Sequence, residues 1–231
     1  MKQLLALTAL LGTALLTTAC GGSDTAPAQA AAPTEATAPA QVTEPGLADE
    51  AADAGIYTVG VIEGNHFVSP WLNLRFESPE GFIMATQEEM LELMAVGLEL
   101  SDIDPATANW LDMALVNEMM AMLPTGSAQV SLVTERLMLS GMTMEQYIEA
   151  AFAGVESLLG WGVEFHDDLR TIEFAGLEWY TYTATIDAFG MDWSYQYLAR
   201  RFGDRMALIT IYALAGQEAY MDALFAGFSA Y

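Results

Sequence analysis

Hydrophobic and polar residues alternate along much of the chain. Apolar and polar positions take turns in 72–76 and again in 130–134, which is the period of a strand with one face buried. Further on, runs rich in Thr, Tyr, Trp, Val and Ile are separated by short turns at Ala175-Gly176, Phe189-Gly190 and Gly203-Asp204. Their spacing predicts four consecutive antiparallel strands between about Val163 and Ala213.

The helical period occurs in three segments. Thr86 and Glu89 have the spacing of a capping box, and a stripe of Met and Leu follows as far as Leu98. A second cap at Thr143 opens a helix that is predicted to reach about Leu159. A third helix is predicted over Gln217–Phe228, close to the end of the chain.

The stretch Leu115–Leu123 fits either period, because its run of methionines suits a helix as well as a strand. Pro124-Thr125-Gly126 and the alternation after it favour a hairpin, so we predict a strand there. Gly64-Asn65, between two β-rich stretches, predicts an opening hairpin. Strands in succession, with helices inserted between hairpins, indicate an α+β fold in which helices flank a mostly antiparallel sheet.

The N-terminus has the pattern of a secretory signal. Lys2 is followed by an apolar run over Leu4–Leu16, and then by small residues up to Cys20. The run is shorter than the roughly 20 residues that a membrane-spanning helix needs. The segment resembles the lipobox of a bacterial lipoprotein, which predicts removal of 1–19 and attachment of diacylglycerol and palmitate to Cys20. We expect the mature protein to be anchored by acyl chains to the extracytoplasmic face of the cell membrane.

The region after the predicted anchor has almost no large apolar residue. Residues 20–55 are rich in Ala, Pro, Thr and Glu, and cannot bury enough surface to offset the entropy cost of ordering. We predict a disordered stalk there, followed by a single globular domain over 56–231. Because Cys20 is the only cysteine, no disulfide framework supports that domain.

The chain is strongly acidic. It has 7 basic and 31 acidic residues, and its net charge is −24. A polyanion of this kind is repelled by nucleic acid, so nucleic-acid binding is excluded. The charge is typical of a solubilising surface, and it also suits attraction to divalent cations or to a basic partner.

Several segments together resemble a known family. They are Asn65-His-Phe-Val-Ser, Ser78-Pro-Glu-Gly-Phe, the helix at Thr86, Thr143-Met-Glu-Gln-Tyr, Phe174-Ala-Gly-Leu-Glu-Trp and Phe228-Ser-Ala-Tyr. They look like the lipid-anchored, PsbP-like proteins of Clostridia-type bacteria, over essentially the whole domain. The resemblance implies a PsbP-like α/β/α sandwich and an accessory or binding role without chemistry. Its motifs are structural, so no functional residue is carried over.

Residues with catalytic or metal-binding chemistry are few. His66 and His166 are the only histidines, and neither belongs to a metal-binding or catalytic motif. Clustered methionines such as Met119, Met120 and Met122 suit core packing, although thioethers also bind copper(I). We expect no cofactor and no resident metal. An extracytoplasmic hydrolase or metal-dependent enzyme whose site is dispersed in the sequence is the alternative to a binding protein.

An aromatic run on the predicted C-terminal strands is the candidate binding surface. By position parity we expect Trp179, Trp193, Tyr195 and Tyr197 to share one face, with Tyr180 and Tyr182 on the other. Cross-strand aromatic pairs also stabilise the interior of a sheet. If the rings face solvent instead, they form a surface for an unknown protein or small ligand, with Arg201 beside them.

Overall fold

The computed structural model describes residues 56–100, 114–137, 143–144, 146–148, 162–166, 168–188 and 190–231, and the predicted signal, Cys20 and the stalk lie outside them. Two antiparallel sheets form the fold. The larger has the order β4 (Ile83–Met84), β5 (Leu115–Met122), β6 (Ala128–Arg136), β11 (Arg205–Leu214), β10 (Met191–Phe202), β9 (Leu177–Ala188) and β7 (Gly162–Phe165), with β8 (Arg170–Phe174) also paired to β9. The smaller has the order β1 (Val61–Glu63), β2 (His66–Ser69), β3 (Leu74–Glu77) and β12 (Phe228–Ala230).

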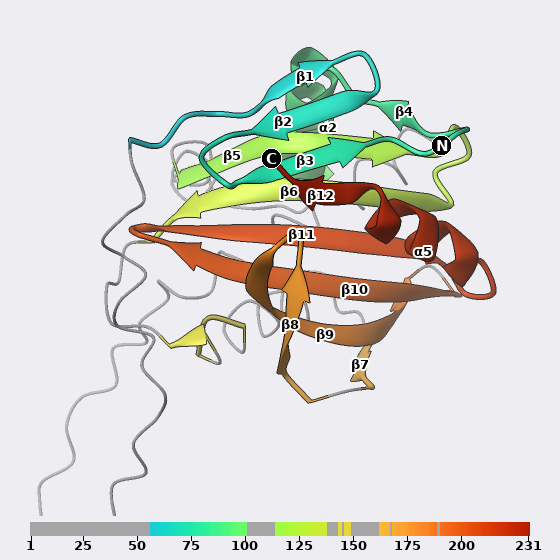
Figure 1. The fold of residues 1–231 in the computed structure, drawn as a ribbon. Coiled ribbons are helices and arrows are strands. Elements are labelled where there is room, and N and C mark those ends of the chain that lie inside the picture. Colours follow the sequence, from blue (N-terminus) through green and yellow to red (C-terminus); the bar gives the residue numbers. More distant parts are fainter. Residues whose placement is uncertain are drawn as a thin grey trace, which may run out of the picture.

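The smaller sheet lies over one face of the larger sheet, as Figure 1 shows. Phe67, Leu74 and Phe76 of the smaller sheet pack there with Ile209 and Ile211 of β11. Helix α5 (Glu218–Ala226) joins the same cluster and connects the last strand of the large sheet to the smaller sheet. This layer of the core is almost wholly aliphatic and aromatic, and its burial stabilises the fold.

The opposite face of the large sheet is aromatic. Tyr182 stacks on Tyr197 with ring centroids 4.9 Å apart, and Tyr195 stacks on Tyr197 at 5.6 Å. Tyr147, from the helical stretch that follows Thr143, packs against this face. Helix α2 (Gln87–Leu100) packs through Met90 onto Met120 of β5 in a separate cluster. No helix in the part of the chain that the structure describes is long and apolar enough to cross a membrane.

The α+β class predicted from the sequence is confirmed, and so are its local signals. The capping box closes α2, since the Thr86 amide donates to Glu89 Oε2 at 2.7 Å and the Glu89 amide donates to Thr86 Oγ1 at 3.2 Å. The Thr143 amide and Gln146 make the same reciprocal pair. How far that second helix extends lies outside the described residues. The ambiguous stretch is strand β5, as predicted.

Two elements differ from the prediction. Between Gly162 and Leu214 the structure has five strands, not the four predicted, because the first predicted strand is divided into β7 (Gly162–Phe165) and β8 (Arg170–Phe174). Each of the two pairs with a different half of the long strand β9. The last helix ends at Ala226, and the next residues form β12, which pairs with β3. The smaller sheet was not predicted, because its last strand comes from the far end of the chain.

Candidate binding cleft

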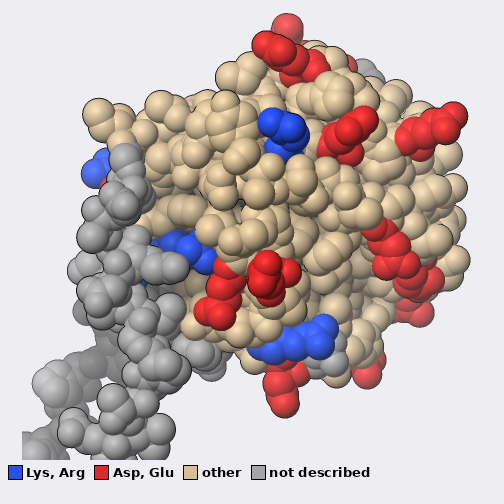
Figure 2. Space-filling model, in the orientation of Figure 1, with Lys and Arg blue, Asp and Glu red and all other residues tan. Residues whose placement is uncertain are grey.

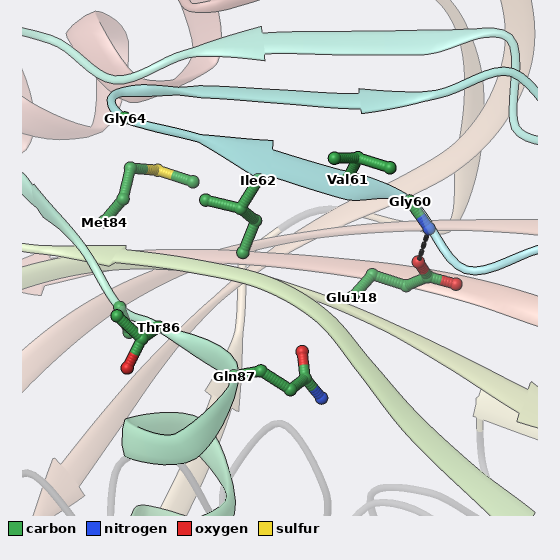
Figure 3. Close-up of a pocket in the computed structure, with 9 residues that line it drawn as sticks. Gly60, Val61, Ile62, Gly64, Met84, Thr86, Gln87 and Glu118 are labelled. Atoms are coloured by element: carbon green, nitrogen blue, oxygen red, sulfur yellow. Dashed lines mark hydrogen bonds between the residues drawn. The ribbon is translucent and has the colours of Figure 1, made fainter.

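A cleft of about 490 Å³ lies between the edges of the two sheets (Figure 3). One wall is β1 with the turn after it, and the other is the junction of β4 with α2. Figure 3 shows Ile62 reaching in from β1, Met84 from β4 and Gln87 from the start of α2. The lining residues are Gly60, Val61, Ile62, Gly64, Met84, Ala85, Thr86, Gln87 and Glu118.

The local sequence explains why both walls end here. β1 and β2 are joined by the two-residue turn Gly64-Asn65, in which Gly64 has a φ of 64°. The second wall is short because Thr86 caps α2 directly after β4. Each sheet therefore stops at a one-sided edge strand, and the cleft is the space between the two edges.

A buried carboxylate, Glu118, lies at the inner end of the cleft. It is the extra residue of a bulge in β5, because Asn117 pairs with Val133 while Met119 pairs with Leu132. The bulge turns Glu118 toward the smaller sheet, and its side chain is only 1% exposed. A charge this far from water is stable only when hydrogen bonds replace its hydration.

Three donors supply those hydrogen bonds. The Tyr57 hydroxyl donates to Glu118 Oε1 at 2.6 Å, and the Thr134 hydroxyl lies 3.2 Å from the same oxygen. The Gly60 amide donates to Oε2 at 2.7 Å. Charge-assisted bonds of this length are stronger than neutral ones, so they hold the carboxylate in one position.

Tyr57 anchors the segment that leads into the cleft. Its ring packs edge-on against Trp71 with centroids 5.0 Å apart, and the Arg205 guanidinium lies 3.7 Å from the ring centroid. Burial, reinforced by the bond to Glu118, raises the pKa of Tyr57 far above its usual value. The hydroxyl therefore keeps its proton and remains a donor to Glu118.

Gly60 allows the close approach that brings its amide to Glu118. A Cβ at this position would lie 2.2 Å from Cε2 of Phe67 and 3.0 Å from the carbonyl oxygen of Val68. Real Cβ atoms do not come this near to other atoms, so any larger residue would push the chain away from the smaller sheet. Glycine is thus required here by space, whereas Gly64 is favoured by its positive φ.

The lining residues suit binding better than covalent chemistry. None of them is His, Cys or Ser, and the one hydroxyl, on Thr86, donates to Glu89 at 2.9 Å. Hydrogen bonds from Thr86 also lower the pKa of Glu89, so this carboxylate stays charged beside the cleft. The lining is mixed, because Val61, Ile62, Met84 and Ala85 are apolar while Gln87 and the fixed carboxylate of Glu118 are polar, a combination that ligand sites use.

The surroundings of the cleft are apolar and acidic. Val61 of β1 and Ile83 of β4 are 56% and 57% exposed, which is high for side chains of this kind. No Lys or Arg lines the cleft. Figure 2 shows Asp and Glu side chains spread over one face of the molecule, with fewer basic ones among them.

The predicted aromatic surface lies in the interior. Trp179, Trp193, Tyr195 and Tyr197 are each no more than 1% exposed, so the solvent-facing alternative is wrong and the rings are core. Trp193, Tyr195 and Tyr197 share one face as predicted, but the predicted faces of Trp179 and Tyr182 are wrong. Trp179 packs with the smaller sheet, while Tyr182 lies with Trp193 on the other face. Odd and even positions separate the two faces within one strand, but they do not carry over to the next strand. The register across the turn pairs Tyr182 with Tyr197, so these two rings lie on the same face.

The remaining candidates do not form one site. Arg201 is half-buried on β10, and its Nε donates to the Gly203 carbonyl at 3.1 Å. His66 lies on β2, and His166 follows β7 in the other sheet, where its Nε2 is 2.5 Å from Thr185 Oγ1. Across the described ranges, no group of three or more His, Cys, Asp or Glu side chains is placed to hold a metal ion.

The methionines of the Met119-Met120-Ala-Met122 run do not all meet at one place. Met119 packs between the sheets, whereas Met120 and Met122 share the cluster under α2 on the opposite face. Sulfurs on opposite faces of a strand cannot share one copper ion, so Met119 is separated from the other two, and both Met119 and Met120 are buried core residues.

Sequence reasoning missed Glu118. The available signal was a single acidic residue inside a mostly apolar strand, LVNEMMAM. A charged residue in such a run is either exposed or held by specific partners. Tyr57 lies 61 positions before Glu118 and 77 positions before Thr134. Only the tertiary structure brings Tyr57 to the other two residues.

Comparison with solved structures finds similar folds at low sequence identity. Cyanobacterial PsbP (CyanoP) from Synechocystis sp. PCC 6803 is 10% identical, with a TM-score of 0.43 over 77% of this chain and 98% of that one. LpqN of Mycobacterium tuberculosis, described as involved in cell envelope biogenesis, is 9% identical, with a TM-score of 0.39 over 74% and 88%. A protein from Bacteroides thetaiotaomicron VPI-5482 is 9% identical, with a TM-score of 0.40 over 74% and 49%.

A PsbP-like protein is thus among the structures that this chain resembles, as the sequence resemblance implies. No protein-family model matches the chain, and no curated protein matches it. All three TM-scores lie below 0.5, so function is inferred from the cleft and from the N-terminal sequence, not from these likenesses.

Proposed function

We propose that this chain is a lipid-anchored extracytoplasmic accessory protein that binds a ligand or partner in the cleft between β1 and β4 and does no chemistry on it. The observation that carries the proposal is the cleft of about 490 Å³, with apolar side chains on both walls and the buried Glu118 carboxylate at its inner end. A fixed charge in a partly apolar cleft orients a ligand, and the hydrogen bonds from Tyr57 and Gly60 keep that charge in place.

The anchored location is supported by the signal-like residues before Cys20. A stalk over 20–55 would hold the domain, and with it the cleft, away from the bilayer. The enzyme alternative is not proposed, because no lining residue offers a nucleophile with an adjacent base.

The binding proposal is tested by filling the cleft. Gln87 is exposed and lines the cleft, so Gln87→Trp inserts a large ring there without disturbing the core. Ala95→Trp, on the exposed side of the same helix, is the matched control. We expect crosslinking in intact cells to capture a partner or ligand with wild type and Ala95→Trp, and at least tenfold less with Gln87→Trp. Equal capture by all three variants would remove the cleft from consideration.

The anchor is tested separately by labelling cells with radioactive palmitate. Wild type is expected to take up label and to sediment with membranes, because two or more acyl chains hold a protein stably. Cys20→Ala is expected to lose both properties. Label in the Cys20→Ala variant, or an unmodified thiol on the native protein, would contradict the anchoring proposal.

A further inference from the structure

β1 presents unpaired backbone groups to the cleft. Among the described strands it pairs with β2 alone, so its other edge is open. Glu63 and His66 flank a two-residue turn and form a hydrogen-bonded pair, which makes Ile62 and Phe67 the next, non-bonded pair. The amide and carbonyl of Ile62 therefore point away from β2. Gly60 confirms this orientation, since its amide, two residues earlier, points the same way and reaches Glu118.

β4 presents a matching edge on the other wall. The Ala85 amide donates to the Met120 carbonyl at 2.9 Å, which makes Ala85 and Met120 a hydrogen-bonded pair. Met84, opposite Ala121, then belongs to a non-bonded pair, and its amide and carbonyl point away from β5. Ile62 and Met84 both line the cleft, so the open edges of both sheets face the same space.

These edges are short, and Glu63 is their one charged residue, so they lack the Lys and Pro that often protect an edge strand. Val61 and Ile83 are exposed apolar side chains on the two strands. An extended segment laid in the cleft would hydrogen-bond to Ile62 and place apolar side chains against this rim. Strand addition of this kind is a recurring mode of peptide recognition.

The charge of the site selects the occupant. Glu118 lies at the inner end, Glu63 ends β1, and Glu89 stays ionised beside the other wall. A second copy of this chain would carry the same carboxylates and the same net charge of −24, so the two copies would repel each other. A basic segment is attracted instead.

We propose that the cleft receives an extended, basic segment of a partner protein, which adds as a strand along β1. This inference rests on the proposed binding function and names the class of ligand. Main-chain hydrogen bonds to Ile62 hold the segment in register, and the carboxylates around the cleft select Lys or Arg over Asp or Glu.

The probe is a short fluorescent peptide in which Lys and Val alternate, titrated into the full-length protein in detergent and followed by anisotropy. The same peptide with Glu in place of Lys is the charge control. Ile62→Pro removes the outward amide and keeps the ladder to β2, because that amide makes no bond within the sheet. Ile62→Ala loses comparable side-chain packing and keeps the amide, so the two variants are a matched pair.

We expect the Lys peptide to bind wild type and the Glu peptide to fail. Ile62→Pro is expected to bind about fivefold more weakly than Ile62→Ala, which corresponds to one backbone hydrogen bond. A Lys peptide N-methylated on alternate residues gives a second readout on wild type, independent of how either variant folds. The methyl groups can be placed on the odd or on the even residues of the peptide. Only one of these two methylated peptides is expected to lose binding.

Equal affinity for Ile62→Pro and Ile62→Ala, or for both methylation registers, would overturn strand addition. Absence of any peptide binding, while Gln87→Trp still abolishes capture in cells, would overturn it too and leave the binding function standing. If Gln87→Trp has no effect on capture, the proposed function itself fails.

Discussion

Glu135 should make the stability of this protein fall as the pH rises from about 4.5 to 7. Its side chain is 6% exposed on the aromatic face of β6, and one donor, the Tyr147 hydroxyl, reaches it at 2.9 Å. Burial raises the pKa of Glu135 from 4.5 to about 7, and the bond from Tyr147 offsets only part of the increase. The carboxyl group is thus held neutral below pH 7 in the folded protein.

The sign follows from proton binding. Between about pH 4.5 and 7 the folded state keeps a proton on Glu135 that the unfolded chain has already released. The free energy of unfolding then falls by about 1.4 kcal/mol per pH unit, or about 3 kcal/mol over the interval. The stabilisation is complete below pH 4.5 and is lost as the pH rises through 7.

Glu135→Gln tests this reasoning, because glutamine mimics the protonated carboxyl and still accepts from Tyr147. Urea unfolding at pH 8 should show the variant about 3 kcal/mol more stable than wild type, and at pH 4.5 the two should agree within about 0.5 kcal/mol. Glu173→Gln, at an exposed position of β8, removes the same charge and corrects for general repulsion in this acidic chain. The same stability difference at both pH values, or an equal effect of Glu173→Gln, would refute the argument.

Two further predictions concern the cleft. Tyr57→Phe removes the 2.6 Å bond to Glu118 and should lower the free energy of unfolding by about 2 kcal/mol, whereas Tyr220→Phe, on an exposed ring, should change it by less than about 0.5 kcal/mol. Equal effects of the two changes in urea unfolding would mean that Glu118 does not depend on this donor. Gly60→Ala should cost about 2–3 kcal/mol through the contact with Phe67, and Gly64→Ala only about 1 kcal/mol through its positive φ. If thermal unfolding shows a larger loss of stability for Gly64→Ala than for Gly60→Ala, the backbone at Gly60 shifts at little cost and the argument from space is refuted.

Local signals in the sequence were accurate where neighbouring residues decide the structure. The capping boxes at Thr86 and Thr143 form through side chains three residues away, and the turn at Gly64-Asn65 depends on its own backbone. Each of these needs only a few adjacent residues, so its composition is sufficient to predict it.

The faces on which the aromatic side chains lie, and the number of C-terminal strands, could not be predicted from neighbouring residues. Trp179 and Trp193 share a parity but lie on opposite faces, because the register across the turn pairs Tyr182 with Tyr197. β7 and β8 pair with different parts of β9, and that division becomes visible only once the strands are paired. Register is a property of two strands, and a single run of residues does not contain it.

The sequence by itself determined the acidic charge, the α+β class, the capped helices and the tight turns, because these depend on composition and on residues near one another in the chain. Only the tertiary structure decided that β12 returns to pair with β3 and that Tyr57, Gly60 and Thr134 meet around Glu118. Those contacts join residues far apart in the sequence. They form because a buried carboxylate must find donors and an apolar sheet face must be covered, and the chain does this with whatever segments the fold brings near.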